Sequence, residues 1–531
     1  MERKTEVLNS YALISVSDKT NIAEVARALV DQGVNIISTG GTLKVLQEND
    51  IPVKAVESFT DFPELMDGRV KTLHPKIHGG ILANRKIDHH MDELKDHEIP
   101  KIDYVIANLY PFEETLLNPD HTSEDLIENI DIGGVTLLRS AAKNYQAVSI
   151  VTDPKDYPSF IKAIETDGKT SKSFRKYLAL KAFQSTAHYD TIIAQSLAER
   201  KPSAFDDQFE WPFANFSFTN KEVLRYGENS HQKATYYKAT QPKNNEIASA
   251  NQLNGKALSY NNIKDADTAL KIVQEFQEPM AVSVKHMNPS GAAIGKTIEE
   301  AFERCYKADS TSIYGGIVAV NRPVTLALAE RLSEIFLEII IAPEFEKDAL
   351  ELLSKKKNLR LLEVDTTASS TSDDQLSLTS VSGGLLVQTE DDASELDDPS
   401  QFELMTDRKP TEKELKAMQF NMKIVKFVKS NAIVVGNEYM TLGVGAGQMN
   451  RVQAADIAIK QAEANEDNLL STFVMASDAF LPMADTAELA AKHNISAIIQ
   501  PGGSIHDDKS VEVCNAENIA MVKTDRRHFR H

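Results

Sequence analysis

Cysteine is scarce in this sequence, because the 531 residues include only Cys305 and Cys514. The two lie far apart and lack partner spacing, which argues against a disulfide framework and against a cysteine-rich zinc site. We therefore expect both to be small side chains in a hydrophobic core.

Long hydrophobic runs and an excess of basic charge are also missing. No stretch of about 18 uninterrupted apolar residues occurs, and no apolar run that could serve as a signal peptide follows the polar start Met1 to Glu6. We therefore expect a cytoplasmic protein with no membrane partner. The formal net charge is −20, whereas nucleic-acid binders need broad basic surfaces. Basic residues that bind an anionic ligand are therefore expected in local clusters.

What is present is the composition of an ordinary globular protein, with 42% hydrophobic and 26% charged residues. The length predicts about three packed units, at roughly 100–200 residues per domain. The first part alternates apolar runs with helical patterns: strands at 11–16, 34–38, 104–107 and 147–151, and helices at 22–29 and 178–197. This alternation is typical of an α/β domain with a parallel sheet.

A boundary is expected near residue 200, since the acidic and aromatic segment 205–212 has no clear period and reads as a linker. Patterning of the α/β type then returns. It predicts strands at 280–284, 317–320, 472–476 and 495–499, and helices at 264–276, 326–336, 452–464 and 485–493. A polar stretch at 366–380, rich in Ser, Thr and Asp, reads as an exposed loop between two subdomains.

Polar residues collect at the expected strand ends of the first domain. Thr39-Gly40-Gly41-Thr42 joins a strand to a helix and offers backbone N–H groups and hydroxyls to an anion. Ser15 to Thr20 lies at the same sheet edge, where open α/β sheets bind ligands. In 68–75, an extended chain would put Arg69 and Lys71 on one face.

In the second part, Lys285 and His286 follow an apolar strand. A strand-end histidine is more often structural than catalytic, but a neighbouring cation favours the neutral imidazole that accepts a proton. The polar loop 225–232, the amide of Asn431 and the glycine-rich turn 443–451 are separate candidates. The last fits neither a Walker loop nor a dinucleotide fingerprint.

These motifs resemble, over nearly the whole chain, the family of bifunctional purine enzymes that combine aminoimidazole-carboxamide ribotide (AICAR) formyltransferase with inosinate (IMP) cyclohydrolase. The resemblance implies that residues 1–199 form a cyclohydrolase domain with a methylglyoxal-synthase-like, doubly wound fold. It implies that residues 200–531 form the transferase domain, with two cytidine-deaminase-like α/β subdomains divided roughly at 365–385.

For the first domain the resemblance implies closure of formyl-AICAR to IMP with loss of water. Positive charge and N–H or O–H donors would stabilise the oxyanion of this reaction. The expected catalytic residues are Lys71 and Tyr110 for that oxyanion and Asp131 with Lys143 for proton movement. The expected nucleotide-binding residues are Ser15, Ser17, Lys19, Thr39, Gly40, Gly41, Thr42, Arg69, Thr72 and Asn108.

For the second domain the resemblance implies transfer of a formyl group from 10-formyltetrahydrofolate to the amine of AICAR, without a catalytic metal. His286 would act as the base, Lys285 would support it electrostatically, and Asn431 would polarise the formyl oxygen. The expected substrate contacts are Arg225, Tyr226, Gly315, Glu338, Arg451 and Arg527. The expected folate contacts are Phe480, Pro482, Ser504 and Ile505.

The resemblance further implies a homodimer whose partners are AICAR, formyl-AICAR, IMP and folate. Five residues depart from the family's usual ones, and we expect altered packing or folate affinity at most: Ser230, Ser290, Leu481, Met483 and His506. Two alternatives remain at this point. One is a nucleotide-sensing protein without turnover, which the set of candidate catalytic residues disfavours, and the other is a zinc deaminase, which the cysteines disfavour.

Overall fold

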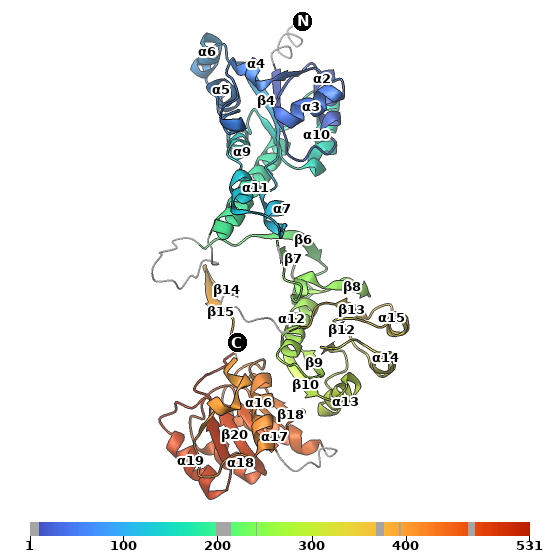
Figure 1. The fold of residues 1–531 in the computed structure, drawn as a ribbon, viewed down its shortest axis with the longest axis vertical. Helices are drawn as coiled ribbons and strands as arrows, with labels where there is room; N and C mark the ends of the chain where they lie inside the picture. The colour runs from blue at the N-terminus through green and yellow to red at the C-terminus, as the bar shows by residue number, and fades with distance from the viewer. Residues whose placement is uncertain (1–9, 198–213, 241, 368–375, 392–393, 466–472) are drawn as a thin grey trace. The chain divides into compact units, whose positions relative to one another are not determined.

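The computed structural model describes residues 10–197, 214–240, 242–367, 376–391, 394–465 and 473–531 (Figure 1). The described chain divides into two compact units, 1–217 and 218–531. The expected boundary near residue 200 and the expected linker at 205–212 lie outside the described residues. No helix among the described residues is long and apolar enough to cross a membrane.

The first unit is built on a five-stranded parallel sheet in the order β3-β2-β1-β4-β5, as its alternating pattern predicts. Figure 1 shows α2, α3 and α10 on one side of this sheet and α5 and α9 on the other. The strands are β1 (Ser10–Ser15), β2 (Asn35–Ser38), β3 (Val53–Ala55), β4 (Lys101–Ala107) and β5 (Ser149–Val151).

Five of the first unit's helices, α2, α3, α4, α7 and α10, follow the carboxyl ends of β1 to β5, which places the intervening loops along one sheet edge. The helices are α2 (Ile22–Asp31), α3 (Gly40–Glu48), α4 (Val56–Thr60), α5 (Pro75–Leu82), α6 (Asp88–Asp96), α7 (Phe112–Leu117), α8 (Ser123–Glu128), α9 (Gly133–Lys143), α10 (Tyr157–Asp167) and α11 (Lys172–Leu197). Short 3₁₀ turns are η1 (Met66–Gly68) and η2 (Pro154–Asp156).

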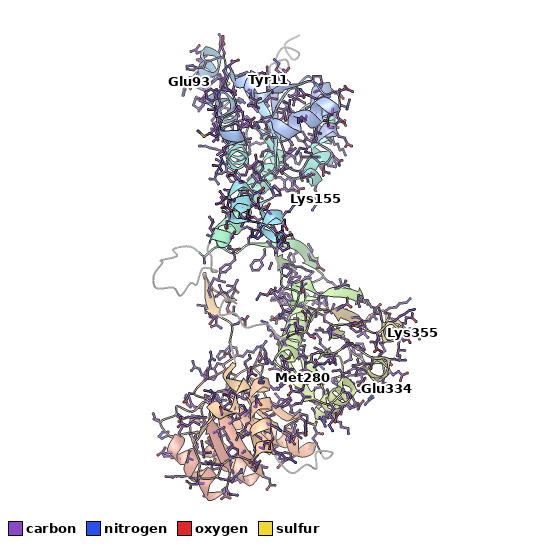
Figure 2. All side chains as sticks on the ribbon, viewed as in Figure 1. Tyr11, Glu93, Lys155, Met280, Glu334 and Lys355 are labelled. Carbon is purple, nitrogen blue, oxygen red and sulfur yellow. The ribbon has the colours of Figure 1, made fainter. Side chains whose placement is uncertain are left out.

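The second unit opens with a separate two-stranded sheet, β6 (Phe218–Leu224) and β7 (Ala234–Ala239). A six-stranded sheet follows in the order β10-β9-β11-β12-β13-β8. Its strands are β8 (Asn251–Asn254), β9 (Met280–Lys285), β10 (Asn288–Ile294), β11 (Ile317–Val320), β12 (Ile339–Ala342) and β13 (Arg360–Glu363). Met280, labelled in Figure 2, begins β9. The helices are α12 (Tyr260–Gln274), α13 (Ile298–Ala308), α14 (Leu326–Ser333) and α15 (Lys347–Leu353), and η3 is Ile247–Ser249.

A second six-stranded sheet repeats this plan in the order β16-β21-β20-β19-β17-β18. Its strands are β16 (Glu403–Leu404), β17 (Ile433–Gly436), β18 (Thr441–Gly445), β19 (Phe473–Ser477), β20 (Ile495–Gln500) and β21 (Ala520–Lys523). The helices are α16 (Glu412–Val425), α17 (Arg451–Ala464), α18 (Asp485–Lys492) and α19 (Asp507–Ala516), with η4 (Ser394–Asp397) and η5 (Pro399–Gln401) before them.

The two sheets share one topology. In each, three parallel strands (β11, β12, β13 or β19, β20, β21) are flanked by an antiparallel hairpin and an antiparallel edge strand. The hairpin edges β10 and β18 meet, since Ala292 N–H donates to Thr441 Oγ1 at 3.0 Å and Ala293 bridges Met440. One hydrophobic cluster contains residues of both α12 and α16, and another contains residues of both α13 and α17.

Two expectations need correction. The stretch at 366–380 is not a loop throughout, because β14 (Leu376–Val381) pairs with β15 (Gly384–Thr389) as a hairpin. The helix expected at 326–336 ends at Ser333. The mixed α/β class is confirmed, and both cysteines are free and buried, as expected.

Candidate functional site

The first candidate site lies where β1 and β2 end and α3 begins. Ser15 and Thr39 bring their hydroxyls to 3.2 Å of each other. The buried Thr42 accepts the Val16 N–H at 3.2 Å and donates to the Val16 carbonyl at 3.0 Å, which ties the helix to the end of β1. Gly40, with φ +47°, allows the chain to enter the helix directly from the strand.

Two lysines bracket the first turn of α3. A Cβ built at Gly40 would lie 3.3 Å from Lys71 Nζ, and one at Gly41 would lie 3.7 Å from Lys19 Nζ. This turn contains no acidic residue, and the Thr39 side chain does not cap it. Two ammonium groups beside the N–H groups of a helix start favour the binding of an anion such as a phosphate.

The prediction that the chain is extended over 68–75 is wrong at Arg69. Its backbone is helical, with φ −62° and ψ −29°, because it closes the turn η1. The alternation rule for strands therefore does not apply, and the exposed Arg69 forms an ion pair with Glu128. Lys71 instead pairs with Glu64 at 2.8 Å. The nearby Thr72 is buried, and a Cβ built at Gly133 would lie 3.0 Å from its hydroxyl.

Asn108 shapes the loop after β1. Its Oδ1 accepts the N–H groups of Ser17 at 2.6 Å and Asp18 at 3.0 Å, and its Nδ2 donates to the Asp18 carbonyl. Lys19 Nζ donates to the Ser17 carbonyl at 3.1 Å. The Asn108 amide is thus occupied by backbone groups, and its observed contacts fix the loop that carries Ser17 and Lys19.

Tyr110, Asp131 and Lys71 form the second half of this site. Asp131 is buried, and its carboxylate accepts the N–H groups of Gly134 at 2.7 Å and Tyr110 at 3.2 Å. Burial raises the pKa of Asp131, although these two N–H groups oppose the shift. Burial and the Asp131 charge raise the pKa of the half-exposed Tyr110, while the Lys71 ammonium opposes this.

Lys143 lies far from Tyr110, Asp131 and Lys71 in the same chain. It is the last residue of α9, whereas Asp131 lies just before the helix begins. At 1.5 Å per residue the helix separates them by about 15 Å. The expected exchange of a proton between Asp131 and Lys143 is therefore not supported by the geometry of a single chain.

The second candidate site centres on the turn between β9 and β10. Lys285 ends β9, and its Nζ donates to the Tyr314 carbonyl at 2.9 Å. His286 and Met287 form the turn, with φ +55° and +60°. Both backbones are therefore in the left-handed region, although neither residue is glycine. Asn288 begins β10, and its Nδ2 donates to the His286 carbonyl at 3.1 Å. The His286 side chain is exposed at this point.

Asn431 lies near this turn. Lys429 N–H donates to Asn288 Oδ1 at 3.0 Å, so the segment 429–431 is joined to the turn of His286. Asn431 Nδ2 donates to the Gln448 carbonyl at 2.8 Å. The structure thus joins the segment that carries Asn431 to the turn that carries His286 through Lys429 and Asn288.

Arg451 is buried beneath this segment, which differs from the expected substrate contact. Its guanidinium donates to Asn431 Oδ1 at 2.7 Å and to the carbonyl of Ala432 at 3.2 Å. It also forms an ion pair with the fully buried Asp478. With 5% of its surface exposed, Arg451 has the contacts of a residue that orients Asn431.

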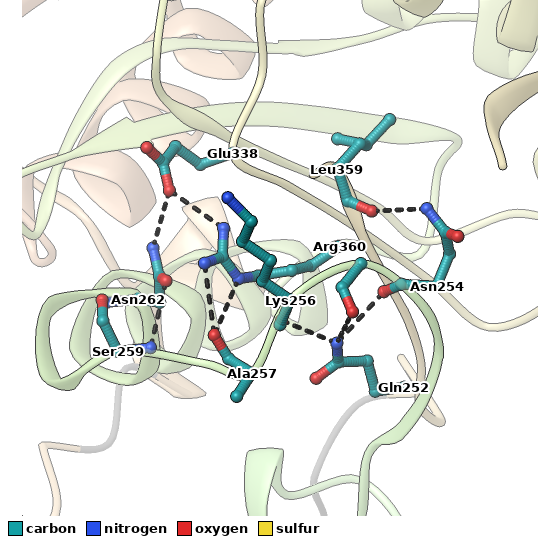
Figure 3. A network of polar contacts seen from close by, with 10 residues as sticks. Gln252, Asn254, Lys256, Ala257, Ser259, Asn262, Glu338, Leu359 and Arg360 are labelled. Carbon is teal, nitrogen blue, oxygen red and sulfur yellow. Dashed lines mark hydrogen bonds and ion pairs between the residues drawn. The ribbon is translucent and has the colours of Figure 1, made fainter. Parts of the chain in front are cut away.

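Glu338 is held beside the start of α12 in a polar network (Figure 3). One of its oxygens, Oε2, accepts Asn262 Nδ2 at 3.2 Å and Arg360 Nη1 at 3.1 Å. Arg360 also donates to the Ala257 carbonyl. Gly315 follows Tyr314, whose carbonyl binds Lys285, and its φ of +74° favours glycine.

The remaining expected contacts are exposed or partly exposed, and no described hydrogen bond links them to these networks. Arg225 stacks on Tyr226, with 5.4 Å from guanidinium to ring centre, and the loop after them closes through hydrogen bonds to Gln232. Phe480 and Pro482 follow β19, and Ser504 and Ile505 follow the neighbouring β20. Ile505 is 90% exposed, and Arg527 stacks on Phe529.

Known proteins match this chain along almost its whole length. A family model described as "AICARFT/IMPCHase bienzyme" matches residues 141–461, and an "MGS-like domain" matches residues 21–136. A relative from Pediococcus pentosaceus, "Bifunctional purine biosynthesis protein PurH", is 52% identical over 520 residues, or 98% of this chain and 99% of the relative. The protein of the same name from Oceanobacillus iheyensis is 52% identical over 526 residues, or 99% and 100%.

The chain belongs to the AICARFT/IMPCHase bienzyme family. It is a bifunctional enzyme of purine biosynthesis with AICAR formyltransferase and IMP cyclohydrolase activities, and its N-terminal domain is MGS-like. The comparisons do not support the alternative of a sensing protein without turnover. A solved structure titled "Crystal structure of ForH" is 34% identical and covers 35% of this chain and 96% of its own, with a TM-score of 0.33.

Several residues of this bienzyme were missed by sequence reasoning. Asp265, Asn288, Gln448 and Asp478 all bind the segments that carry His286 or Asn431. Asp265 is one of four charged residues in α12, and its position in the sequence gives no signal of its own. Among the described residues, no group of three or more His, Cys, Asp or Glu side chains has a metal-binding arrangement.

Proposed function

We propose that the second unit carries the formyl transfer, with the turn of His286 and the segment of Asn431 as its active centre. The observation that supports this assignment is the hydrogen bond from Lys429 N–H to Asn288 Oδ1, because it joins the two segments. The domain limits proposed for the two activities are 1–199 for the cyclohydrolase and 200–531 for the transferase.

Formyl transfer needs a base, a nearby positive charge and an amide that donates a hydrogen bond to the formyl oxygen. The AICAR amine is a poor nucleophile, because its lone pair is delocalised into the ring. His286 accepts the amine proton as the nitrogen attacks the formyl carbon of 10-formyltetrahydrofolate, and Asn431 Nδ2 donates to the developing oxyanion. The bond from that carbon to N10 then breaks, N10 takes up a proton, and the products are formyl-AICAR and tetrahydrofolate.

Lys285 is proposed to support this step by its charge, and Glu338, Gly315, Arg225, Tyr226 and Arg527 to bind AICAR. The ends of β19 and β20 present Phe480, Pro482, Ser504 and Ile505, which we assign to the folate. Carboxyl ends of parallel strands are the usual ligand edge of an α/β sheet. The exposure of Phe480 and Ile505 agrees with a surface that a pterin ring would cover.

Cyclisation is assigned to the first unit. The carboxamide nitrogen attacks the formamide carbon, and water is lost. Lys71 and the Tyr110 hydroxyl are proposed to stabilise the oxyanion, while the start of α3 with Lys19 holds the phosphate. Asp131 is the proposed proton-transfer group, and Lys143 is proposed to act in the same site only through a neighbouring subunit. This last assignment agrees with the homodimer that the family resemblance suggests, and we propose the cytoplasm as the location.

The assignment of the two activities is tested with one pair of assays. The protein is given AICAR and 10-formyltetrahydrofolate, and tetrahydrofolate is followed; separately it is given formyl-AICAR, and IMP is followed. His286→Ala should abolish the first activity and leave the second intact, while His493→Ala, a surface histidine paired with Glu463, should change neither. Formyl transfer by His286→Ala at the normal rate would disprove the assignment.

A further inference from the structure

The turn that carries His286 has an unusual backbone. Two-residue hairpin turns with positive φ at both positions are usually formed by Asn-Gly or Gly-Gly, because a Cβ disfavours this conformation. Here the two positions are His286 and Met287, with φ +55° and +60°. Neither residue favours the left-handed region, so the turn needs support from its surroundings.

Asp265 of α12 supplies that support. Its Oδ2 accepts the His286 N–H at 3.2 Å, and its Oδ1 accepts the Met287 N–H at 2.7 Å. One carboxylate therefore binds both consecutive N–H groups of the turn, and charge-assisted bonds of this kind are stronger than neutral ones. On the opposite side, Asn288 Nδ2 binds the His286 carbonyl at 3.1 Å.

We propose that Asp265 is a positioning residue for formyl transfer, which sets the backbone of His286 and so directs its imidazole to the AICAR amine. The inference rests on the proposed role of His286 as the base. The carboxylate binds the backbone N–H groups, and Asp265 acts on the reaction through His286. Asp265 is part of α12. Asn262, the partner of the N-cap Ser259 in the capping box of this helix, also binds Glu338, so one helix supports both the base and a proposed AICAR contact.

The first test replaces Asp265 in the full-length protein. Asp265→Ala should lower kcat for formyl transfer by roughly 10- to 100-fold, since the left-handed turn loses its acceptors. Cyclisation of added formyl-AICAR should stay at the normal rate, because that site lies in the first unit. Asp267→Ala removes a carboxylate from the same helix that pairs with Lys271 at 3.4 Å, and should keep kcat within about twofold.

The second test separates positioning from other roles of the carboxylate. Glycine adopts positive φ without the Cβ penalty, so Met287→Gly should lower the cost of the turn. If Asp265 acts through the turn, the double variant Asp265→Ala/Met287→Gly should recover kcat by roughly fivefold or more over Asp265→Ala. Absence of recovery in a folded double variant would overturn the proposal.

Asp265→Asn covers the case in which the alanine variant does not fold. It keeps one acceptor oxygen, so we expect kcat between those of the wild type and Asp265→Ala, with Met287→Gly again raising it. A normal kcat in both Asp265 variants would overturn the inference. The role of His286 is judged separately, because full transfer by His286→Ala would disprove the proposed function itself.

Discussion

Arg451 Nη2 donates to Asn431 Oδ1 at 2.7 Å, and the same guanidinium is paired with the buried Asp478. The side-chain carbonyl oxygen of Asn431 therefore already accepts a hydrogen bond from the buried Arg451. Nδ2 gives one of its two N–H groups to the Gln448 carbonyl. The orientation of the amide is thus fixed by two partners, and its second N–H is the one that we propose donates to the formyl oxygen.

Arg451→Lys tests this orientation. A single ammonium keeps the charge next to Asp478 but does not provide the planar fork that reaches both Asp478 and Asn431. We expect kcat for formyl transfer to fall roughly 10-fold and the free energy of unfolding to fall by about 1–3 kcal/mol. Both are measured on the purified variant, by steady-state kinetics and by urea unfolding.

The control is Arg331→Lys, on the partly exposed α14, where the guanidinium pairs with Glu303 and Glu334. Exposed pairs contribute little, so both quantities should remain close to those of the wild type. An unchanged kcat in Arg451→Lys, together with lowered stability, would mean that Arg451 serves the fold and not the orientation of Asn431.

Lys71→Met tests the anion site of the first unit. Its ammonium lies beside Gly40 and influences Tyr110, so its loss removes positive charge from the helix start and from the proposed oxyanion. We expect kcat/KM for cyclisation to fall by roughly 100-fold or more, as for loss of one oxyanion donor, with formyl transfer unchanged.

Lys76→Met is the matched control, because Lys76 pairs with the exposed Asp61 at 2.9 Å. It should cyclise formyl-AICAR at the normal rate. Equal losses in the two lysine variants would indicate a general effect of charge on the unit and would contradict a local role of Lys71.

Local sequence patterns predicted many of the strands and helices of this fold, but they did not predict which distant residues contact one another. The strand 317–320 is observed with those bounds, and the strand-to-helix step at Gly40 is present, because an apolar run and a glycine pair are short-range signals. The hairpin beginning at Leu376 was missed, because the polar composition of 366–380 outweighed a short strand pattern in which Leu376 and Leu378 alternate with Ser377 and Thr379. Both strands of this hairpin are largely exposed and cover no core.

The candidate sites show the same limit. Asp265 and His286 are 21 positions apart, and Arg451 and Asp478 are 27 apart, so no spacing rule links them. Arg451 was expected to bind substrate because its motif resembles the family's, yet burial beside Asp478 turns the guanidinium inward. Residue types identify candidate chemistry, but the partners of each group depend on tertiary packing.

Glu414 provides a prediction about pH. Burial would raise the pKa of this carboxyl, but Arg408 donates to both oxygens at 2.9 and 2.8 Å and the Thr411 N–H adds a third bond, so the pKa falls to about 2. Because the folded pKa lies below the unfolded value of about 4.3, the stabilisation is full above that value and is lost as pH falls toward 2.

Glu414→Gln should therefore lower the free energy of unfolding at pH 7 by about 1–3 kcal/mol and make its decrease between pH 5 and pH 2 shallower. Urea unfolding across this pH range measures both effects. Glu412→Gln, on the same helix but exposed beside Lys416, is the control. A slope as steep as that of the wild type in Glu414→Gln would show that other carboxylates control the acid response.

Arg360→Met tests whether the orientation of Glu338 matters for AICAR. Arg360 is largely buried and holds Glu338 Oε2 at 3.1 Å, with Asn262 on the same oxygen (Figure 3). Loss of the guanidinium leaves the Glu338 charge in place but frees its side chain, so binding should weaken more than chemistry. We expect the KM for AICAR to rise roughly 5- to 20-fold, with kcat within about twofold.

Lys256→Met makes the matching change in the same loop. The Lys256 side chain is exposed, and its carbonyl accepts Gln252 Nε2 at 2.8 Å, a backbone contact that the substitution preserves. The KM for AICAR should stay close to the wild-type value, and calorimetric titration with AICAR should give the same ranking as the kinetics. If both variants raise the KM equally, the cause is the loss of positive charge near the site, and the contact between Arg360 and Glu338 has no specific role.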